Sequence, residues 1–311
     1  MKIKKKKVLI VLGGISGERE VSLETGRACF KALKKKGYKV VKFDPKKQSY
    51  NIITRYKSFT IFNALHGRHG EDGVAQSFFE YLGVPYTHSG VISSFNAMNK
   101  VISKKIYKKN KILSPNYFVF EKETFSKDEL QKIIRKKKIQ FPIVAKPVNE
   151  GSSIGVKICS NINELFISGK QLFKKYEELV FEPFIGGQEI QVAVINGFPI
   201  GAIELKPKRK FYDYKAKYSK AAKTEHIMPA KLNKSDYNKV LKIAKKAHKC
   251  LDCKGVTRSD FKFYKKKFYL LETNTQPGMT SLSLVPEIAS YKGISFENLV
   301  EKILLNASIN R

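Results

Sequence analysis

Residues 255–283 read GVTRSDFKFYKKKFYLLETNTQPGMTSLS, and the interpretation of the chain starts from this stretch. Two runs rich in β-branched and aromatic residues, 256–263 and 268–272, flank a lysine-rich turn, which predicts a β-hairpin. The turn contains no glycine to adopt a positive φ angle. The pairing of the two strands therefore has to be inferred from the chemistry of their side chains.

Four polar side chains of this hairpin gather on one face if the turn is centred on Lys266. Residues two apart in a strand share a face, so Asp260 then lies opposite Glu272 and Arg258 opposite Asn274. Carboxylate and amide oxygens suit Mg²⁺ held against phosphates, and the guanidinium can stabilise a transferring phosphoryl or acyl group. A cross-strand salt-bridge ladder on a solvated face explains the hairpin alone equally well.

The length and composition indicate a large globular protein. At 311 residues, the chain is long enough for two or three domains, and its 42% content of hydrophobic residues excludes a disordered protein. No apolar run reaches the roughly 18 residues that a membrane helix needs. The apolar run at residues 8–12 follows a basic N-terminus but is too short for a secretory signal. We therefore expect a cytoplasmic protein with no membrane partner.

The formal net charge of +33 at pH 7 raises the question of a nucleic-acid partner. The excess is mostly lysine, however, and it is spread over the whole chain. The sequence shows neither zinc-finger spacing nor an aromatic RNA-recognition signature. We expect no specific nucleic-acid partner, and at most weak nonspecific binding at low salt.

The four cysteines do not indicate a disulfide framework in a chain of this length without a signal sequence. Cys250 and Cys253 form a CxxC pair, but no second pair at zinc-ligand spacing accompanies it. We expect packed thiols rather than a metal or redox site.

The N-terminal region predicts a Rossmann-like unit. Strands at 8–12 and 38–43 flank a helical pattern, although the first loop does not match GxGxxG. Glu18 lies in that loop, at the carboxyl end of a strand, where open α/β sheets bind their ligands. An acidic residue near a helix N-terminus is an equally ordinary explanation. His66 ends the next strand, 60–65, within a glycine-rich turn, and is a second candidate for the site.

A second unit carries candidate phosphate-binding groups. An amphipathic helix that begins near Phe95 carries Lys100, and Lys146 ends an apolar strand. The Gly/Ser loop at residues 150–155 can direct backbone N–H groups at phosphates. No GK[ST] follows, which disfavours a P-loop NTPase. After another strand and a short helix, the strand at residues 179–185 carries Glu182 and can join two domains.

The third unit combines a hairpin and a long loop. Residues 189–195 alternate in polarity, Asn196-Gly197 is a strong turn signal, and a further strand follows at 198–204. The basic and aromatic loop at residues 209–226 has no convincing period. A loop of this length in a compact enzyme is typically a lid or a binding element.

Five stretches, taken in this order, resemble the D-alanine–D-alanine ligase family of the ATP-grasp superfamily. The stretches are LGGISGEREVSL, ALHGRHGEDG, KPVNEGSSIGV, FYDYKAKY and LLETNTQPGMTSLSLVP. The resemblance covers essentially the whole chain, and the joint occurrence of the stretches is specific although each alone is weak.

The resemblance implies a three-domain ATP-grasp architecture of the α+β and α/β classes. We expect a Rossmann-like N-terminal domain at 1–88, a central domain at 89–184 and a C-terminal domain at 185–311, with ATP held between the last two. It implies that ATP phosphorylates the carboxylate of one D-alanine and that the amine of a second attacks the acyl phosphate. The products are D-alanyl-D-alanine, ADP and phosphate, for peptidoglycan precursors.

The resemblance also implies roles for individual positions. Catalytic positions match Glu18, Ser152, Tyr218, Arg258 and Gly278. Positions that bind the two D-alanine molecules match Glu18, His66, Tyr212, Lys217 and Ser283. Positions that bind ATP match Lys100, Lys146, Ser152, Glu182, Phe184 and Glu189. Ligands of two Mg²⁺ ions, which Mn²⁺ can replace, match Asp260, Glu272 and Asn274.

Two local features bear on specificity. Tyr218 in its FYDYKAKY context favours an amine as the second nucleophile over the hydroxyl of D-lactate. Pro183 and Phe184 stand where relatives often carry a lysine and a bulky residue, which affects the details of base recognition.

The alternative functions are a different ATP-grasp carboxylate–amine ligase, an inactive binding relative and a basic nucleic-acid-binding module. A homodimer is expected from the resemblance alone.

Overall fold

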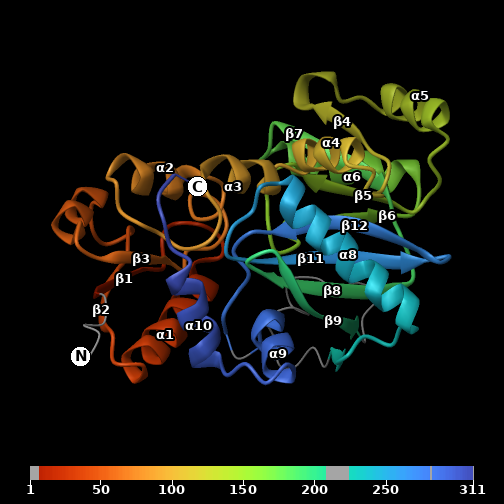
Figure 1. The fold of residues 1–311 in the computed structure, drawn as a ribbon. Coiled ribbons are helices and arrows are strands. Elements are labelled where there is room, and N and C mark those ends of the chain that lie inside the picture. Colours follow the sequence, from red (N-terminus) through yellow and green to blue (C-terminus); the bar gives the residue numbers. More distant parts are fainter. Residues whose placement is uncertain (1–6, 208–223, 281, 311) are drawn as a thin grey trace.

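Within residues 7–207, 224–280 and 282–310, the computed structural model contains three β-sheets, each formed by a different part of the sequence (Figure 1). Helices cover these sheets and alternate with their strands along the chain. This arrangement agrees with the mixed helix and strand content that the sequence predicts.

The N-terminal sheet is parallel, with the strand order β2-β1-β3. Its strands are β1 (Lys7–Val11), β2 (Lys39–Phe43) and β3 (Thr60–Asn63), and the helices that accompany them are α1 (Arg19–Lys35), the 3₁₀ helix η1 (Tyr50–Tyr56) and α2 (Val74–Tyr81). The central strand β1 is buried on both faces: Val8 and Ile10 pack in one apolar cluster, and Leu9 and Val11 in another. Its sequence is therefore continuously apolar rather than alternating.

The central sheet is antiparallel, with the order β4-β7-β5-β6. Its elements are β4 (Phe118–Glu121), η2 (Lys122–Thr124), α5 (Lys127–Lys137), β5 (Ile143–Pro147), β6 (Lys157–Cys159), α6 (Ile162–Phe173) and β7 (Glu178–Pro183). Aromatic rings fill its core: Phe118 stacks on Phe181 with ring centres 5.2 Å apart, and Phe125 lies 5.9 Å from Phe181. The opposite face is left for the site described below.

The C-terminal sheet is antiparallel, with the order β10-β9-β8-β11-β12. Its elements are β8 (Gln188–Ile195), β9 (Phe198–Lys206), β10 (Glu225–Ile227), α8 (Lys234–Cys250), β11 (Val256–Tyr264), β12 (Lys267–Asn274), α9 (Leu284–Tyr291) and α10 (Phe296–Leu305). The predicted turn at Asn196-Gly197 is confirmed, with φ angles of 50° and 79°. Alternation along β8 places Ile190 and Val192 in the core that also contains residues of α8.

The hairpin β11–β12 confirms the predicted pairing but not the predicted turn. Arg258 lies opposite Asn274, and Asp260 opposite Glu272. The turn itself consists of two lysines, at positions 265 and 266, which adopt φ angles of 47° and 60°. The prediction of a turn centred on Lys266 is therefore wrong by half a residue, and a bulge between Asp260 and the next residue makes up the difference.

The helix predicted to run from Phe95 past Lys100 is in fact two helices, α3 (Val91–Met98) and α4 (Lys100–Lys109). Asn99 separates them with extended backbone angles, and its side chain accepts hydrogen bonds from the N–H groups of the second and third residues of α4. An asparagine at this position stabilises a new helix start rather than a continuous helix. Lys100 consequently lies in the first turn of α4.

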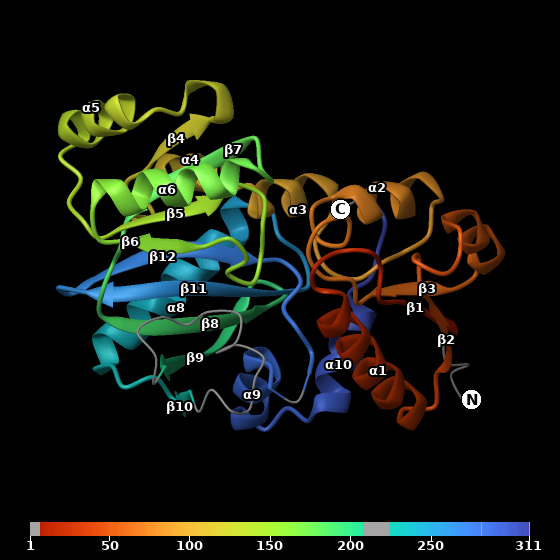
Figure 2. The ribbon, with the colours of Figure 1, turned by 180° about the vertical axis from the view of Figure 1, so that it is seen from behind.

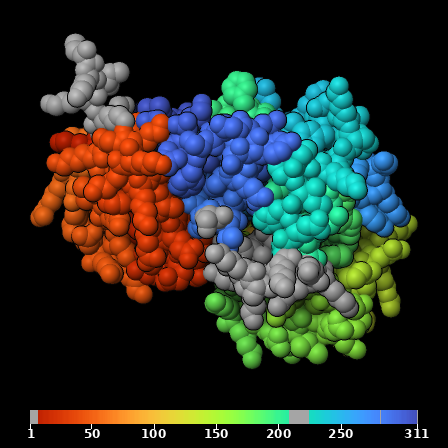
Figure 3. All heavy atoms as spheres, turned by 90° about the horizontal axis from the view of Figure 1, so that it is seen from below, coloured from red at the N-terminus to blue at the C-terminus, as the bar shows by residue number. Residues whose placement is uncertain are grey.

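The central and C-terminal sheets lie one above the other, and the N-terminal sheet lies to their side (Figure 2). Helix α10 returns to the N-terminal part and packs on α1, where Lys36 pairs with Glu301 at 2.8 Å. Seen from below, the C-terminal residues, in blue, lie between the orange N-terminal part and the cyan and green remainder of the molecule (Figure 3). In the described ranges, no helix has both the length and the apolar character required to cross a membrane.

Candidate active site

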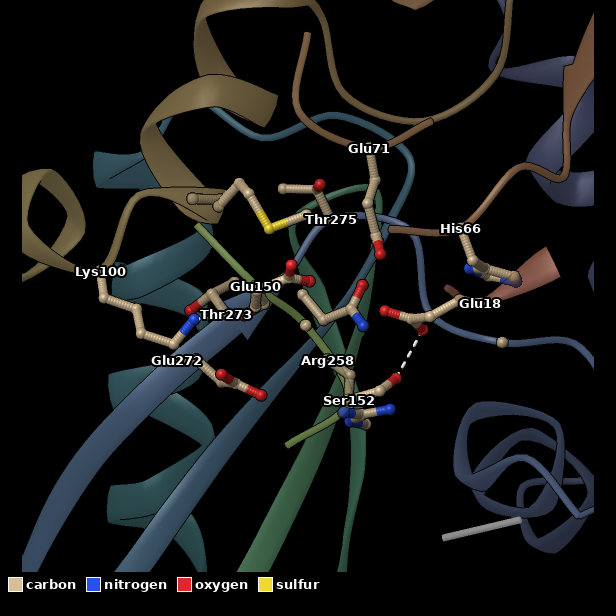
Figure 4. Close-up of a pocket in the computed structure, with 15 residues that line it drawn as sticks. Glu18, His66, Glu71, Lys100, Glu150, Ser152, Arg258, Glu272, Thr273 and Thr275 are labelled. Carbon is tan, nitrogen blue, oxygen red and sulfur yellow. Dashed lines mark hydrogen bonds between the residues drawn. The ribbon is translucent and has the colours of Figure 1, made fainter. Parts of the chain in front are cut away.

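The polar face of the β11–β12 hairpin opens into a cavity where all three parts of the chain meet (Figure 4). Arg258, Glu272 and Asn274 line it from the hairpin. The Arg258 guanidinium forms a bidentate ion pair with Asp260, with Nε–Oδ1 and Nη2–Oδ2 distances of 2.7 and 2.9 Å. The hairpin is thus a wall of the cavity and not a solvated salt-bridge ladder.

The N-terminal part contributes Glu18, which directly precedes α1 and is 3% exposed. Ser152, from the Gly/Ser loop between β5 and β6, donates its hydroxyl to Glu18 Oε2 at 2.5 Å. Ser152 and Ser153 both adopt positive φ angles, 49° and 61°. The loop is therefore folded tightly enough to bring a residue of the central part onto a carboxylate of the N-terminal part.

His66 lies near the start of the loop that follows β3 and is buried beside Glu18 in the same cavity. Its Nε2 atom shares a hydrogen bond of 3.0 Å with the hydroxyl of Thr25. Burial, together with the nearby Arg258 cation, lowers the pKa of His66 to about 4. The imidazole is consequently neutral at physiological pH.

Glu71 is a cavity residue that the sequence interpretation missed. It is 6% exposed, and its Oε1 atom accepts a hydrogen bond from the Gly67 N–H at 2.8 Å. Burial and the neighbouring charge of Glu18 raise the pKa of Glu71 well above its usual value. Its signal was the same as that of Glu18, an acidic residue in a glycine-rich loop after a strand of the parallel sheet.

A second cavity lies between the central and C-terminal sheets. Its apolar lining residues are Val144, Ile154, Val156, Phe184, Ile185 and Leu271. Charged side chains line the remainder, namely Lys100, Lys146, Glu182, Glu189, Asp260, Lys262 and Glu272. Lys100 and Glu272 border both cavities, so the two cavities adjoin at the hairpin.

Buried ion pairs organise the lysines of this second cavity. Glu182 forms an ion pair with Lys146 through one carboxylate oxygen and with Lys104 through the other. Burial alone would raise the pKa of Glu182, but the two cations lower it to about 2. Lys100 donates to the Glu150 carbonyl, and burial lowers its pKa to about 8. Glu189 pairs with Lys262 at 2.9 Å. Lys104 was not predicted, because a lysine in a basic helix carries no distinguishing signal.

Two comparisons of sequence identify the family. Residues 106–305 match the family model described as D-ala D-ala ligase C-terminus. A D-alanine–D-alanine ligase of Pelagibacter ubique is 55% identical over 98% of this chain and 99% of its own length. This chain belongs to the D-alanine–D-alanine ligase family. It is accordingly a ligase, and the resemblance drawn from its motifs is confirmed.

Solved structures of two related ligases show the same fold. The ligase of Bacillus anthracis, solved in complex with ATP, superposes with a TM-score of 0.84 at 31% identity and covers 97% of both chains. The VanG D-Ala:D-Ser ligase of Enterococcus faecalis gives a TM-score of 0.83 at 25% identity, over 97% of this chain and 99% of that one. The ATP-grasp architecture expected from the sequence is thereby confirmed.

Some positions expected from the D-alanine–D-alanine ligase resemblance lie at the edge of the site or beyond the described residues. Gly278 lines the first cavity. Ser283 directly precedes α9, and its hydroxyl accepts a hydrogen bond from the Thr280 N–H and shares another with the Thr280 hydroxyl. Tyr212, Lys217 and Tyr218 lie outside the described residues.

Gln276 joins the C-terminal part to the N-terminal part of this ligase. Its side chain donates to the Leu65 carbonyl and accepts from Asn63 Nδ2 at 2.9 Å. All three residues are buried. The link fixes the hairpin's end beside His66, and the sequence offered no indication of it.

Proposed function

We propose that this protein joins two D-alanine molecules into D-alanyl-D-alanine, with the conversion of one ATP to ADP and phosphate. The observation that carries the proposal is that a cavity suited to a nucleotide and a cavity suited to an amino acid share Lys100, Glu150 and Glu272 as lining residues, with Arg258 in the wall of the amino-acid cavity. A γ-phosphate at this junction can reach a carboxylate in the first cavity without crossing solvent. Such proximity is the main requirement of phosphoryl transfer.

The first cavity supports binding of the amino end of the first D-alanine. Glu18 offers an anionic acceptor to the substrate ammonium, and neutral His66 does not repel it. Glu71 lies beside them and adds a second carboxyl group. The substrate carboxylate would then point to Arg258, whose cation stabilises charge that develops on the reacting oxygens.

The second cavity supports binding of ATP. Its apolar walls accommodate the base, Glu182 and Glu189 offer acceptors to adenine and ribose, and Lys100 and Lys146 carry charge complementary to the phosphates. Ser152 lies where the Gly/Ser loop meets the first cavity. The backbone of that loop can cover the phosphates.

Asp260, Glu272 and Asn274 fit the demands of Mg²⁺ bound together with a nucleotide. They supply hard oxygen atoms on one face of the hairpin. In the described ranges, no group of three or more His, Cys, Asp or Glu side chains is arranged to hold a metal. Magnesium in such enzymes is typically held by one or two carboxylates plus phosphates. When bound, two Mg²⁺ ions would neutralise charge on the phosphates, and Mn²⁺ can replace them.

The reaction then follows in two steps. A carboxylate oxygen of the first D-alanine attacks the γ-phosphorus, the bond to ADP breaks, and an acyl phosphate forms. The amine of the second D-alanine attacks the acyl carbon, loses a proton and expels phosphate. Arg258 and the Gly278 N–H would stabilise the tetrahedral oxyanion, and Ser283 would bind the second carboxylate. Tyr212, Lys217 and Tyr218 belong to this proposal on the resemblance alone.

A D-alanine-dependent phosphate-release assay tests the proposal. Purified protein with ATP and Mg²⁺ should release phosphate when D-alanine is added and should remain near background with L-alanine. Equal release with either enantiomer, or without amino acid, would overturn it. The relative VanG is named a D-Ala:D-Ser ligase, so D-serine and D-lactate belong in the panel as second substrates, measured across pH.

Four further assignments, on domain limits, oligomeric state, location and nucleic-acid binding, belong to the same proposal. We propose the domain limits 1–88, 89–184 and 185–311, supported by the three separate sheets. A homodimer and a cytoplasmic location are expected from the family, and light scattering of the purified protein tests the dimer. Sequence-insensitive DNA binding that disappears at physiological salt would show that the net charge supports no specific nucleic-acid contact.

A further inference from the structure

We infer that Lys104 is a positioning residue for nucleotide binding: it keeps Glu182 ionised and oriented toward the base while Lys146 is released to the phosphates. The inference rests on the proposed ATP site. It concerns a residue that does not itself reach the nucleotide cavity.

Lys104 and Lys146 approach Glu182 from two different elements. Lys104 belongs to α4 and lies 2.8 Å from Glu182 Oε2, while Lys146 belongs to β5 and donates to Glu182 Oε1. The Lys104 side chain is 0% exposed, and its Nζ also donates to the Pro115 carbonyl at 3.2 Å. The ammonium lies 5.7 Å from the centre of the Tyr117 ring. These contacts hold Lys104 in a single place.

The two lysines differ in their access to the nucleotide. Lys146 and Glu182 line the cavity between the sheets, whereas Lys104 borders a separate groove beside Lys105 and Lys108. Lys146 can therefore turn toward a phosphate without leaving the cavity. Lys104 cannot do so, and it is the counter-ion that stays with Glu182 when the nucleotide is bound.

The need for a permanent counter-ion follows from burial. The Glu182 side chain is 4% exposed, and the other charged groups that act on the cluster are Lys100 and Glu272. If Lys146 moved to the phosphates without Lys104 in place, Glu182 would be a buried carboxylate with no direct partner. Such a carboxylate either takes up a proton or stays charged and thereby weakens nucleotide binding.

The ionisation state of Glu182 matters for base selection. An ionised carboxylate only accepts hydrogen bonds, so it matches the 6-amino group of adenine and opposes the 6-carbonyl oxygen of guanine. A protonated carboxyl group can donate to that carbonyl. Lys104 thus contributes to the choice of ATP over GTP through Glu182.

Binding of ATP and of GTP by Lys104→Met, measured by calorimetry with Mg²⁺ and without D-alanine, tests the inference. The dissociation constant for ATP should rise roughly 10- to 100-fold, that for GTP should change less, and kcat at saturating ATP should stay within about threefold. Lys105→Met, an exposed neighbour on the same helix, is the matched control and should leave both constants unchanged. Lys104→Arg should restore most of the ATP affinity.

A double-mutant cycle with Glu182→Gln separates this role from general stability. If Lys104 acts through Glu182, Lys104→Met should cost no ATP affinity in the Glu182→Gln background. An equal loss in both backgrounds, or an unchanged ATP/GTP ratio in the single variant, would overturn the inference. Failure of the proposed function is distinguishable, because wild-type protein would then lack D-alanine-dependent phosphate release while the nucleotide-binding comparison remained measurable.

Discussion

Asp260 lies opposite Glu272 because Leu271 is an extra residue in β12. The two-lysine turn sets a register in which Phe261 pairs with Leu270, and a regular ladder would then place Leu271 opposite Asp260. The bulge moves Glu272 into that position instead, and both Leu271 and Glu272 line the nucleotide cavity. One inserted residue thus supplies both an apolar wall and a carboxylate pair.

The carboxylate pair should control metal affinity. Glu272→Gln should weaken Mn²⁺ binding in the presence of ATP by at least about tenfold, because a neutral amide replaces one of two carboxylates. Electron paramagnetic resonance of free Mn²⁺ measures this directly. Glu129→Gln, an exposed carboxylate on α5, is the control. An unchanged Mn²⁺ affinity in Glu272→Gln would remove Glu272 from the metal site. Chelation with EDTA should abolish phosphate release in the wild type.

Arg258 should matter far more for turnover than for nucleotide binding. Arg258→Ala should lower kcat by roughly 10²- to 10³-fold, because the cation stabilises charge that develops during the reaction. The ATP dissociation constant should change far less than kcat, since Arg258 does not itself line the nucleotide cavity and reaches it only through Asp260. Arg258→Lys should recover part of the activity but not the forked geometry. A normal kcat in Arg258→Ala would exclude the proposed role.

The small size of residue 151 should be required at the first cavity. A Cβ atom at Gly151 would lie 2.7 Å from Glu18 Oε1, which would displace the carboxylate proposed to hold the substrate ammonium. Gly151→Ala should therefore lower kcat/KM for D-alanine by roughly 10- to 100-fold. Gly17→Ala provides the matched control, because its Cβ would meet only Ile154 Cδ1 at 3.6 Å, an ordinary contact. Equal activity of the two variants would contradict the prediction.

The buried His66 should make the fold sensitive to acid. Its pKa of about 4 lies below the unfolded value of 6.5, so the unfolded chain binds more protons between these values. The contribution is fully present above pH 6.5 and is lost as the pH falls toward 4, with a magnitude of roughly 3 kcal/mol. Urea unfolding between pH 7 and 4 should show a shallower pH dependence for His66→Gln than for the wild type.

The exposed His69, in the same loop, is the control for this measurement. His69→Gln should retain the wild-type pH dependence of unfolding. Buried His248, whose pKa burial also lowers to about 4, remains in both variants and contributes to the residual slope. Identical slopes for His66→Gln and the wild type would show that His66 does not contribute.

Site residues could be predicted from the sequence where the pattern of neighbouring residues indicated their position. Asp260 and Glu272 were predictable because strand periodicity places them on one face, and Glu18 and His66 because ligands bind at the carboxyl ends of parallel strands. Glu71 carried the same local signal as Glu18 and was overlooked. Lys104 was not predictable, since nothing in a lysine-rich helix distinguishes the one lysine that is buried.

The amino-acid sequence by itself determined the alternation of helices and strands, the Asn196-Gly197 turn and the hairpin that carries the site, because these depend on residues close together in the chain. Tertiary structure decided the bulge at Leu271 and the ion pairs around Glu182. Those features depend on burial and on partners far apart in the sequence. The partner of a charged side chain, and the exposure of that side chain to water, are determined only when the sheets pack together.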